Sequence, residues 1–188
     1  MPVSSKHHER LIVDDEQPKS AKPEKIPHLK PAFQANGSVT AANSSSISDG
    51  AAALVLCSEQ KARDMKIPIR AKIVGYSGHA QEANWFTTAP IFAVKKLLSK
   101  IGWHQDDVDL WEINEAFAAQ ACAVNKDMDW DPAIVNVNGG AIAIGHPIGA
   151  SGCRILNTLL FEMQRRSAKR GLATLCIGGG MGVAMCLE

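Results

Sequence analysis

The chain has 188 residues, of which 46% are hydrophobic and 21% are charged, and its formal net charge at pH 7 is +1. This composition is typical of a globular domain, and the near-neutral charge argues against partners such as nucleic acid or an anionic membrane surface. The five cysteines form no C-x-x-C pair, no cationic leader follows Met1, and no apolar stretch is long enough to cross a membrane, so we expect a cytoplasmic protein without disulfides or a bound metal.

Residues 1–35 differ from the rest of the chain in their density of proline. Five of the nine prolines lie in this segment, at positions 2, 18, 23, 27 and 31. Proline interrupts helices and central strands alike, so an irregular segment is predicted here, with residues 11–13 as a candidate short strand. The paired His7 and His8 have no third ligand near them in the sequence, and we expect no metal site there.

From Val39 onward, predicted strands and helices alternate. Short apolar or β-branched runs indicate strands at residues 51–57, 70–76, 108–113, 134–137, 172–177 and 183–187. Apolar residues at helical spacing indicate helices at residues 59–65, 91–101, 115–126 and 150–166. This alternation predicts an α/β fold with a mostly parallel sheet and helices on both faces. The last two strands are separated only by a glycine-rich turn, so they are expected to form an antiparallel hairpin at one edge of the sheet.

His146 lies between Gly145 and Pro147, immediately before the longest predicted helix. Proline biases the preceding residue toward an extended backbone, and glycine permits close approach of a ligand. The imidazole is therefore expected on a tight loop, where it can donate a hydrogen bond to an oxygen that gains negative charge. A loop histidine bonded only to backbone is the alternative.

Cys176 ends an apolar strand and enters the glycine run of residues 178–180. A thiol beside free backbone N–H groups can be stabilised as a thiolate, and such a thiolate is suited to removing a proton next to a carbonyl group. An inert buried cysteine is the alternative, and it is our interpretation of the other four. The glycine run is not predicted to bind phosphate, because a strand and not a helix follows it.

Three motifs occur in a set order: Asn114-Glu115-Ala116-Phe117-Ala118, Gly145-His146-Pro147 and Cys176-Ile177-Gly178-Gly179-Gly180. Together they resemble the C-terminal half of the thiolase family, most closely its acetyl-CoA acetyltransferases, from about residue 31 to residue 188. The resemblance implies a thiolase-like half, with a mostly parallel five-stranded sheet and helices on both faces. Residues 36–188 would be the C-terminal thiolase domain, and residues 1–35 a remnant of the loop domain.

The resemblance also implies roles for single residues. The histidine matching His146 and a water held by the asparagine matching Asn114 form the first oxyanion hole of the family. The cysteine matching Cys176 is the acid/base group, and the backbone N–H of the glycine matching Gly178 contributes to the second oxyanion hole. From the residues alone, an N-cap role for Asn114 stays open. The cysteine that carries the acyl group belongs to the family's N-terminal half, which we expect this chain to lack.

Residues 40–50 resemble the stretch that contacts the pantetheine arm of coenzyme A. Ser45 is at the hydrogen-bonding position, with Ala41 alongside, and Phe33 matches an aromatic residue that packs on the adenine. The two serines next to Ser45 stand where the family commonly has alanine and glycine, and a turn rich in serine and asparagine is the alternative. Coenzyme A thioesters are therefore expected as substrates, with no further cofactor.

By resemblance, the expected function is acyl transfer in fatty acid metabolism. Two acetyl-CoA condense to acetoacetyl-CoA plus coenzyme A, or the reverse thiolysis runs. This chain would supply the acid/base cysteine and the oxyanion-hole half, beside an N-terminal thiolase half, in a homo-oligomer that is a tetramer in the intact enzyme. The alternative is a catalytically inactive isolated C-terminal domain, or one chain of a split thiolase. Trp85-Phe86 replace the Val-Met common in short-chain enzymes and leave the acyl length open.

Overall fold

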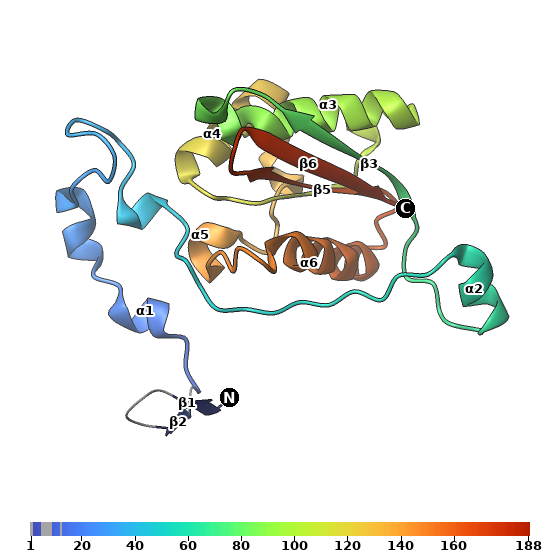
Figure 1. Ribbon diagram of the computed structural model, residues 1–188, viewed down its shortest axis with the longest axis horizontal. Coiled ribbons are helices and arrows are strands. Elements are labelled where there is room, and N and C mark those ends of the chain that lie inside the picture. Colours follow the sequence, from blue (N-terminus) through green and yellow to red (C-terminus); the bar gives the residue numbers. More distant parts are fainter. Residues whose placement is uncertain (1, 5–8, 12) are drawn as a thin grey trace. The chain divides into compact units, whose positions relative to one another are not determined.

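The computed structural model describes residues 2–4, 9–11 and 13–188, and the chain divides into two compact units, Met1–Ala42 and Asn43–Glu188 (Figure 1). The first unit contains β1 (Pro2–Ser4), β2 (Glu9–Leu11), α1 (Glu16–Ser20) and the 3-10 helix η1 (Pro23–His28). β1 and β2 pair antiparallel. The predicted strand at 11–13 falls partly outside the described residues, as do His7 and His8. The predicted boundary after residue 35 stays a prediction.

The second unit holds one sheet and its helices. The strands are β3 (Ile73–Ala80), β4 (Leu110–Ile113), β5 (Gly171–Ile177) and β6 (Met181–Leu187). The α-helices are α2 (Glu59–Asp64), α3 (Ala89–Ile101), α4 (Ala118–Met128), α5 (Ala141–Ile144) and α6 (Ser151–Arg166). Its short 3-10 helices are η3 (Ala83–Thr88), η4 (Gln105–Asp107) and η5 (Pro132–Ile134), and η2 (Ala41–Asn43) spans the boundary between the two units. None of the described helices has the length and apolarity that crossing a bilayer would require.

The strand order is β3-β6-β5-β4, with β4 parallel to β5 and the other two pairs antiparallel. The predicted α/β class and the β5–β6 hairpin are confirmed, but the sheet has four strands and one parallel pair, so the mostly parallel five-stranded sheet is wrong. The hairpin is also not at an edge, because β3 pairs with the outer side of β6.

Two predicted strands account for the difference. At residues 134–137, the turn of η5 and the left-handed backbone of Asn136 (φ 46°) leave a single parallel bridge between Trp111 and Val135. Residues 51–57 belong to no named strand, and Val55 is 94% exposed. Both segments have strand-like sequences, but in the described part of the chain neither has a neighbour that completes a ladder of hydrogen bonds.

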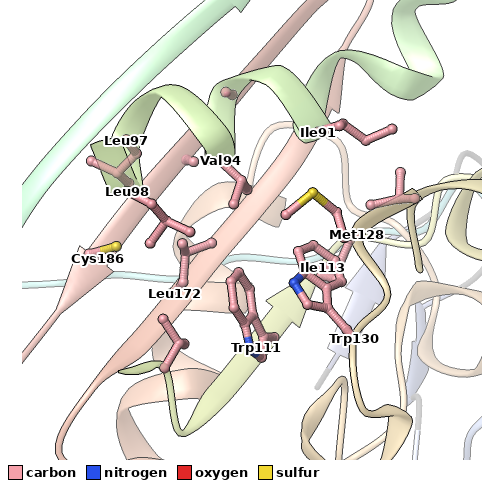
Figure 2. Close-up of a cluster of buried hydrophobic side chains, with 14 residues drawn as sticks. Ile91, Val94, Leu97, Leu98, Trp111, Ile113, Met128, Trp130, Leu172 and Cys186 are labelled. Atoms are coloured by element: carbon pink, nitrogen blue, oxygen red, sulfur yellow. The ribbon is translucent and has the colours of Figure 1, made fainter. Parts of the chain in front are cut away.

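Helices cover both faces of the sheet, as predicted (Figure 1). One core lies between the sheet, α3 and α4, and is built around the ring pair of Trp111 and Trp130, whose centroids are 4.4 Å apart (Figure 2). The other core lies under α6 and includes Leu110, Ile155 and Leu159. Successive residues of a strand point to opposite faces, so Leu110 and Trp111 enter different cores and β4 is buried along its whole length.

Helix ends follow the expected local chemistry. α3 ends at Gly102, whose φ of 72° lies in the left-handed region that glycine tolerates best. α4 begins at Ala118, three residues later than predicted, because the backbone of Phe117 is extended (φ −140°, ψ 146°) and pairs with Ser44 in an antiparallel bridge. This delay leaves residues 114–117 as a loop at the end of β4.

Candidate functional site

Asn114 and Cys176 lie at the same edge of the sheet. Asn114 directly follows β4, and Cys176 is the penultimate residue of β5, which runs parallel to β4 with Thr174 opposite Ile113. The Asn114 N–H donates to the Thr174 carbonyl at 3.0 Å, which extends the ladder to the end of the pair. Because parallel strands present their carboxyl ends together, both residues lie at this edge, and both are buried.

His146 is brought to Asn114 by a tight loop. The backbone N–H of His146 donates to the Ser46 carbonyl at 2.8 Å, and Gly145 before it has φ 88°. A Cβ at Gly145 would lie 2.1 Å from the Ser48 hydroxyl oxygen, so only glycine fits there. The imidazole Nε2 lies 3.5 Å from the Asn114 side-chain nitrogen. Two of the three predicted groups are thus adjacent, although they are 32 residues apart in the sequence.

The electrostatic setting keeps His146 neutral near pH 7. Burial lowers the pKa of His146, and the nearby positive charge of Arg154 lowers it further. On its other side, the ring Nδ1 lies 2.5 Å from the hydroxyl oxygen of Ser151 at the start of α6. The ring is therefore held at both nitrogens in an environment that disfavours the imidazolium form.

Ser45 lies between the Asn114 loop and the His146 loop. Its backbone N–H and its hydroxyl both donate to the Ala116 carbonyl, at 3.1 and 2.9 Å. Two residues further, Ile47 forms a parallel bridge with His146. The Ser45 hydroxyl thus has its single proton committed within the chain, while its oxygen can still accept a hydrogen bond.

Glu115 is a site residue that was not predicted from the sequence. Its carboxylate accepts hydrogen bonds from the Asn136 side chain at 3.3 Å and from the Ile142 backbone N–H at 3.2 Å. It also packs so closely on Gly140 that a Cβ there would lie 2.3 Å from the carboxylate. Glu115 therefore joins the end of β4 to the start of α5, which leads to His146. The only sequence signal for a role of Glu115 was its position directly after Asn114 in the first motif.

Arg154 of α6 was missed as well. Its guanidinium donates to the Asn114 side-chain oxygen at 3.4 Å. Because an arginine has donors only, this contact turns the Asn114 oxygen toward α6 and its NH2 group toward His146. Nε and Nη1 of Arg154 are buried without a hydrogen-bond partner among the described residues. Burial raises the pKa of the neighbouring Glu112 to about 7, although the charge of Arg154 acts against this shift.

The thiol of Cys176 is buried, which affects its pKa. Burial raises its pKa, and a hydrogen bond with its own backbone only partly opposes this. This shift does not favour the expected thiolate, and the acid/base role of Cys176 stays a prediction. Gly178 follows in the exposed turn of the β5–β6 hairpin, with open space around it. The interpretation of the other cysteines as buried holds for Cys186 alone; Cys153 is half-buried, and Cys57 and Cys122 are exposed.

The residues predicted to contact coenzyme A belong to both compact units. Phe33 and Ala41 are part of Met1–Ala42, and Ser45 is part of Asn43–Glu188. The Phe33 ring is 73% exposed. Beside His146, a groove of about 390 Å³ is lined by residues 48–52 and 147–150 and by Cys153, but by none of the predicted site residues. Among the described residues, no cluster of histidine, cysteine and carboxylate side chains is suited to a metal ion.

Glu162 of α6 accepts a hydrogen bond from Asn138, in the loop that leads to α5 and His146. The charge of Glu162 should make the stability of the fold depend on pH. Its 5% exposed side chain accepts hydrogen bonds from Arg165 at 2.8 Å, from Asn138 at 3.1 Å and from Arg166. These bonds, that of Arg165 first, lower the Glu162 pKa from 4.5 to about 2. The stabilisation is therefore present above pH 4.5 and is lost as the pH falls toward 2.

Glu162→Gln should remove this dependence. We expect urea unfolding to show a less stable variant at pH 7, with the difference from wild type shrinking steadily between pH 4.5 and 2.5. Glu59→Gln is a matched control, because Glu59 pairs with Arg63 on exposed α2 and its pKa is also lowered, but solvent screens that pair. A difference for Glu162→Gln that stays constant with pH would contradict the prediction.

Two family profiles match the chain. The profile described as thiolase, N-terminal domain, matches residues 1–60, and that described as thiolase, C-terminal domain, matches residues 67–188. The acetyl-CoA acetyltransferase of Paracoccus denitrificans is 57% identical over 187 residues, which are 99% of this chain and 48% of that protein. That of Shinella zoogloeoides is 62% identical over 160 residues, covering 85% of this chain and 41% of that protein.

Solved structures show the same likeness. The Bacillus anthracis acetyl-CoA acetyltransferase superposes with a TM-score of 0.91 at 45% identity, covering all of this chain and 48% of that one. Human mitochondrial 3-ketoacyl-CoA thiolase in complex with CoA superposes with a TM-score of 0.82 at 39% identity, over 89% of this chain and 43% of that one. The chain spans about half the length of the relatives it matches.

Proposed function

This chain belongs to the thiolase family, and we propose that it supplies the acid/base cysteine and the oxyanion-binding groups of an acetyl-CoA acetyltransferase. The reaction is the condensation of two acetyl-CoA to acetoacetyl-CoA plus coenzyme A, and its reversal by thiolysis. The names of close relatives support this assignment. The predicted family and its α/β fold class are confirmed.

The observation that carries the proposal is the contact of Asn114 with His146 at the sheet edge where the neighbouring strand ends near Cys176. The Asn114 NH2 group and the His146 Nε2 are 3.5 Å apart, and Cys176 ends the neighbouring strand. Held amide and imidazole groups stabilise an oxygen that becomes negative in the transition state. A thiol nearby can move the proton of the adjacent carbon. These are the two operations that carbon–carbon bond formation at a thioester requires.

The steps divide between two halves. A cysteine of the N-terminal half takes up an acetyl group as a thioester, and the coenzyme A thiolate that leaves takes the proton of the Cys176 thiol. Cys176, now a thiolate, takes a proton from the methyl group of a second acetyl-CoA. The resulting carbanion forms a bond to the acetyl carbon, and the C–S bond to the first cysteine breaks, so that cysteine leaves as a thiolate. In thiolysis the order is reversed, and Cys176 returns the proton. Its raised pKa favours the protonated form that this direction needs.

Coenzyme A contacts are proposed at Ser45, Ala41 and Phe33, with no additional cofactor. An aromatic side chain that is 73% exposed, as in Phe33, is suited to packing on an adenine ring. Ser45 keeps an acceptor site on its oxygen, although its proton is used on Ala116. Among the relatives, a human thiolase and an Ascaris suum thiolase have been solved with coenzyme A bound. Assembly into a homo-oligomer and a cytoplasmic location are further expectations.

A second candidate, a catalytically inactive C-terminal domain that binds another protein part, is favoured by the exposed apolar surface. Val55 and Leu56 in the unpaired segment are 94% and 70% exposed. On α4, the outward-facing Ala119, Cys122 and Ala123 are exposed as well. Apolar surfaces of this kind commonly mark contacts with another protein part.

The two candidates are separated by complementation. We expect the purified chain alone to show no thiolysis of acetoacetyl-CoA, and mass spectrometry after incubation with acetyl-CoA to find no stoichiometric acyl adduct. Co-expression with the remaining half of the Paracoccus denitrificans relative should restore thiolysis. A stable acetyl group on Cys176 or Cys153 of the isolated chain would overturn the assignment. A chain that pairs with that half without any activity would leave only the second candidate.

A further inference from the structure

Ser151 is the residue of α6 whose hydroxyl contacts the His146 ring. It is fully buried at the first position of α6. Its oxygen lies 2.5 Å from Nδ1 of His146 and 3.1 Å from the Pro147 carbonyl oxygen. A hydroxyl carries one proton, so it can donate to only one of these two acceptors at a time. Which of the two accepts the Ser151 proton decides which ring nitrogen of His146 carries a proton.

Only one arrangement satisfies every contact. If Ser151 donates to the Pro147 carbonyl, which has no proton of its own, its oxygen accepts from Nδ1–H of His146. Nε2 then keeps its lone pair, and the Asn114 NH2 group at 3.5 Å faces an acceptor. If Ser151 donates to Nδ1 instead, Nε2 must carry the proton and two donors face each other. The Pro147 carbonyl keeps the Ala150 N–H as a donor at 2.7 Å in either case, so the conflict at Nε2 is what distinguishes the two arrangements.

Asn114 cannot relieve that conflict by turning its amide. Its oxygen receives a hydrogen bond from Arg154 at 3.4 Å, and a guanidinium has no acceptor to offer the NH2 group. The NH2 group therefore stays on the His146 side, and Arg154, Asn114 and Ser151 together favour one proton position on the ring. Ser151 sets the position of the ring proton directly, because it is the residue that binds Nδ1.

We propose that Ser151 is a positioning residue that selects the tautomer of His146 with the proton on Nδ1. The second ring nitrogen, Nε2, is then presented to the site as an acceptor. The tautomer of a histidine is generally set by the partner of its other nitrogen. The role of this tautomer in catalysis rests on the proposed function. There, Nε2 takes up one proton and becomes a donor to a substrate oxygen, while the Ser151 oxygen still accepts from Nδ1–H.

The test is nitrogen NMR of the His146 ring in the ¹⁵N-histidine-labelled chain, assigned by the spectrum of His146→Gln. In the wild type we expect the Nδ1–H tautomer. In Ser151→Ala the Nδ1–H group loses its acceptor, and the ratio of Nδ1–H to Nε2–H should fall by about 3- to 10-fold, the effect of one hydrogen bond. Ser151→Thr keeps a hydroxyl and should keep the wild-type ratio.

Ser77→Ala is a matched control. Ser77 is also a buried serine, and its hydroxyl donates to the Ala93 carbonyl at 2.5 Å, between β3 and α3. We expect a comparable loss of stability and an unchanged His146 ratio. An unchanged ratio in folded Ser151→Ala, or an equal change in Ser77→Ala, would overturn the proposal. If Ser151→Ala fails to fold, Ser151→Cys, whose sulfur is a weak acceptor, must still lower the ratio.

The measurement needs no substrate and no N-terminal half. Failure of complementation would therefore reject the proposed function and leave the tautomer result standing. Conversely, a wild-type ratio in Ser151→Ala would reject this inference alone. The proposed function and the role of Ser151 can therefore be rejected independently of each other.

Discussion

Cys176→Ser should lower the rate of condensation in the complemented enzyme by about 10²–10⁴-fold, the usual contribution of a general acid/base group. The hydroxyl of serine is far less acidic than a thiol, so it is not ionised near neutral pH. Without its anion, it cannot take the proton from the methyl group of acetyl-CoA. Acyl loading of the N-terminal half does not use this proton and should survive in part. Rapid-quench kinetics that separate acyl loading from condensation would show the difference.

The matched control for this change is Cys186→Ser. Cys186 is also a buried free cysteine in the same sheet, on β6, and burial raises its pKa to about 12. It should cost stability and leave condensation unaffected in the folded fraction. His146→Ala should also lower the rate, by about 10²–10³-fold, through loss of oxyanion stabilisation. Condensation in Cys176→Ser within a factor of about three of wild type would exclude the acid/base role.

Gly180→Ala should produce a large loss of stability, of about 2–5 kcal/mol. Gly180 has φ 92°, and a left-handed backbone costs a residue with a Cβ about 1–2 kcal/mol. The new Cβ would also lie 2.0 Å from the Gln81 carbonyl oxygen. That oxygen is backbone, so the hairpin turn must shift, and overpacking of this kind costs about 1–3 kcal/mol. Urea unfolding at pH 7 would measure the change.

Gly179→Ala separates the two causes. Gly179 lies next to Gly180 in the same turn with a similar φ of 87°, but its nearest contact for a Cβ is a flexible methionine methyl group at 3.8 Å. It should therefore show only the cost of the left-handed backbone, about 1–2 kcal/mol. Equal losses for the two variants would show that the contact with Gln81 has no energetic weight.

Local sequence was sufficient for the elements whose signals are short-range. The apolar spacing from Ile91 to Ile101 and the glycine that follows predicted α3 and its end, because one helical turn and its cap involve only neighbouring residues. The hairpin of β5 and β6 was predictable for the same reason. The sheet itself was not, since residues 51–57 and 134–137 are as strand-like as β4 in sequence and lack only a completed set of partners.

For the candidate site, the motifs identified Asn114, His146 and Cys176, and they implied Gly178, Ser45, Ala41 and Phe33. The structure brings Asn114 next to His146 and places Cys176 on the adjacent strand end. It also shows that burial raises the Cys176 pKa, which the neighbouring glycines did not reveal. A pKa depends on how much water and charge surround a group in three dimensions.

The sequence by itself therefore determined which reactive side chains this protein carries, where its longest helices α3 and α6 lie and which family it resembles, because each of these depends on residues close together along the chain. Apart from the β5–β6 hairpin, only the tertiary structure decided which strands pair, and it alone decided how the site is held. Glu115 reaches residues 21 and 27 positions away, and Arg154 reaches Asn114 across 40. Such contacts arise from packing α6 and the loops against the sheet edge, and no local pattern encodes their distances.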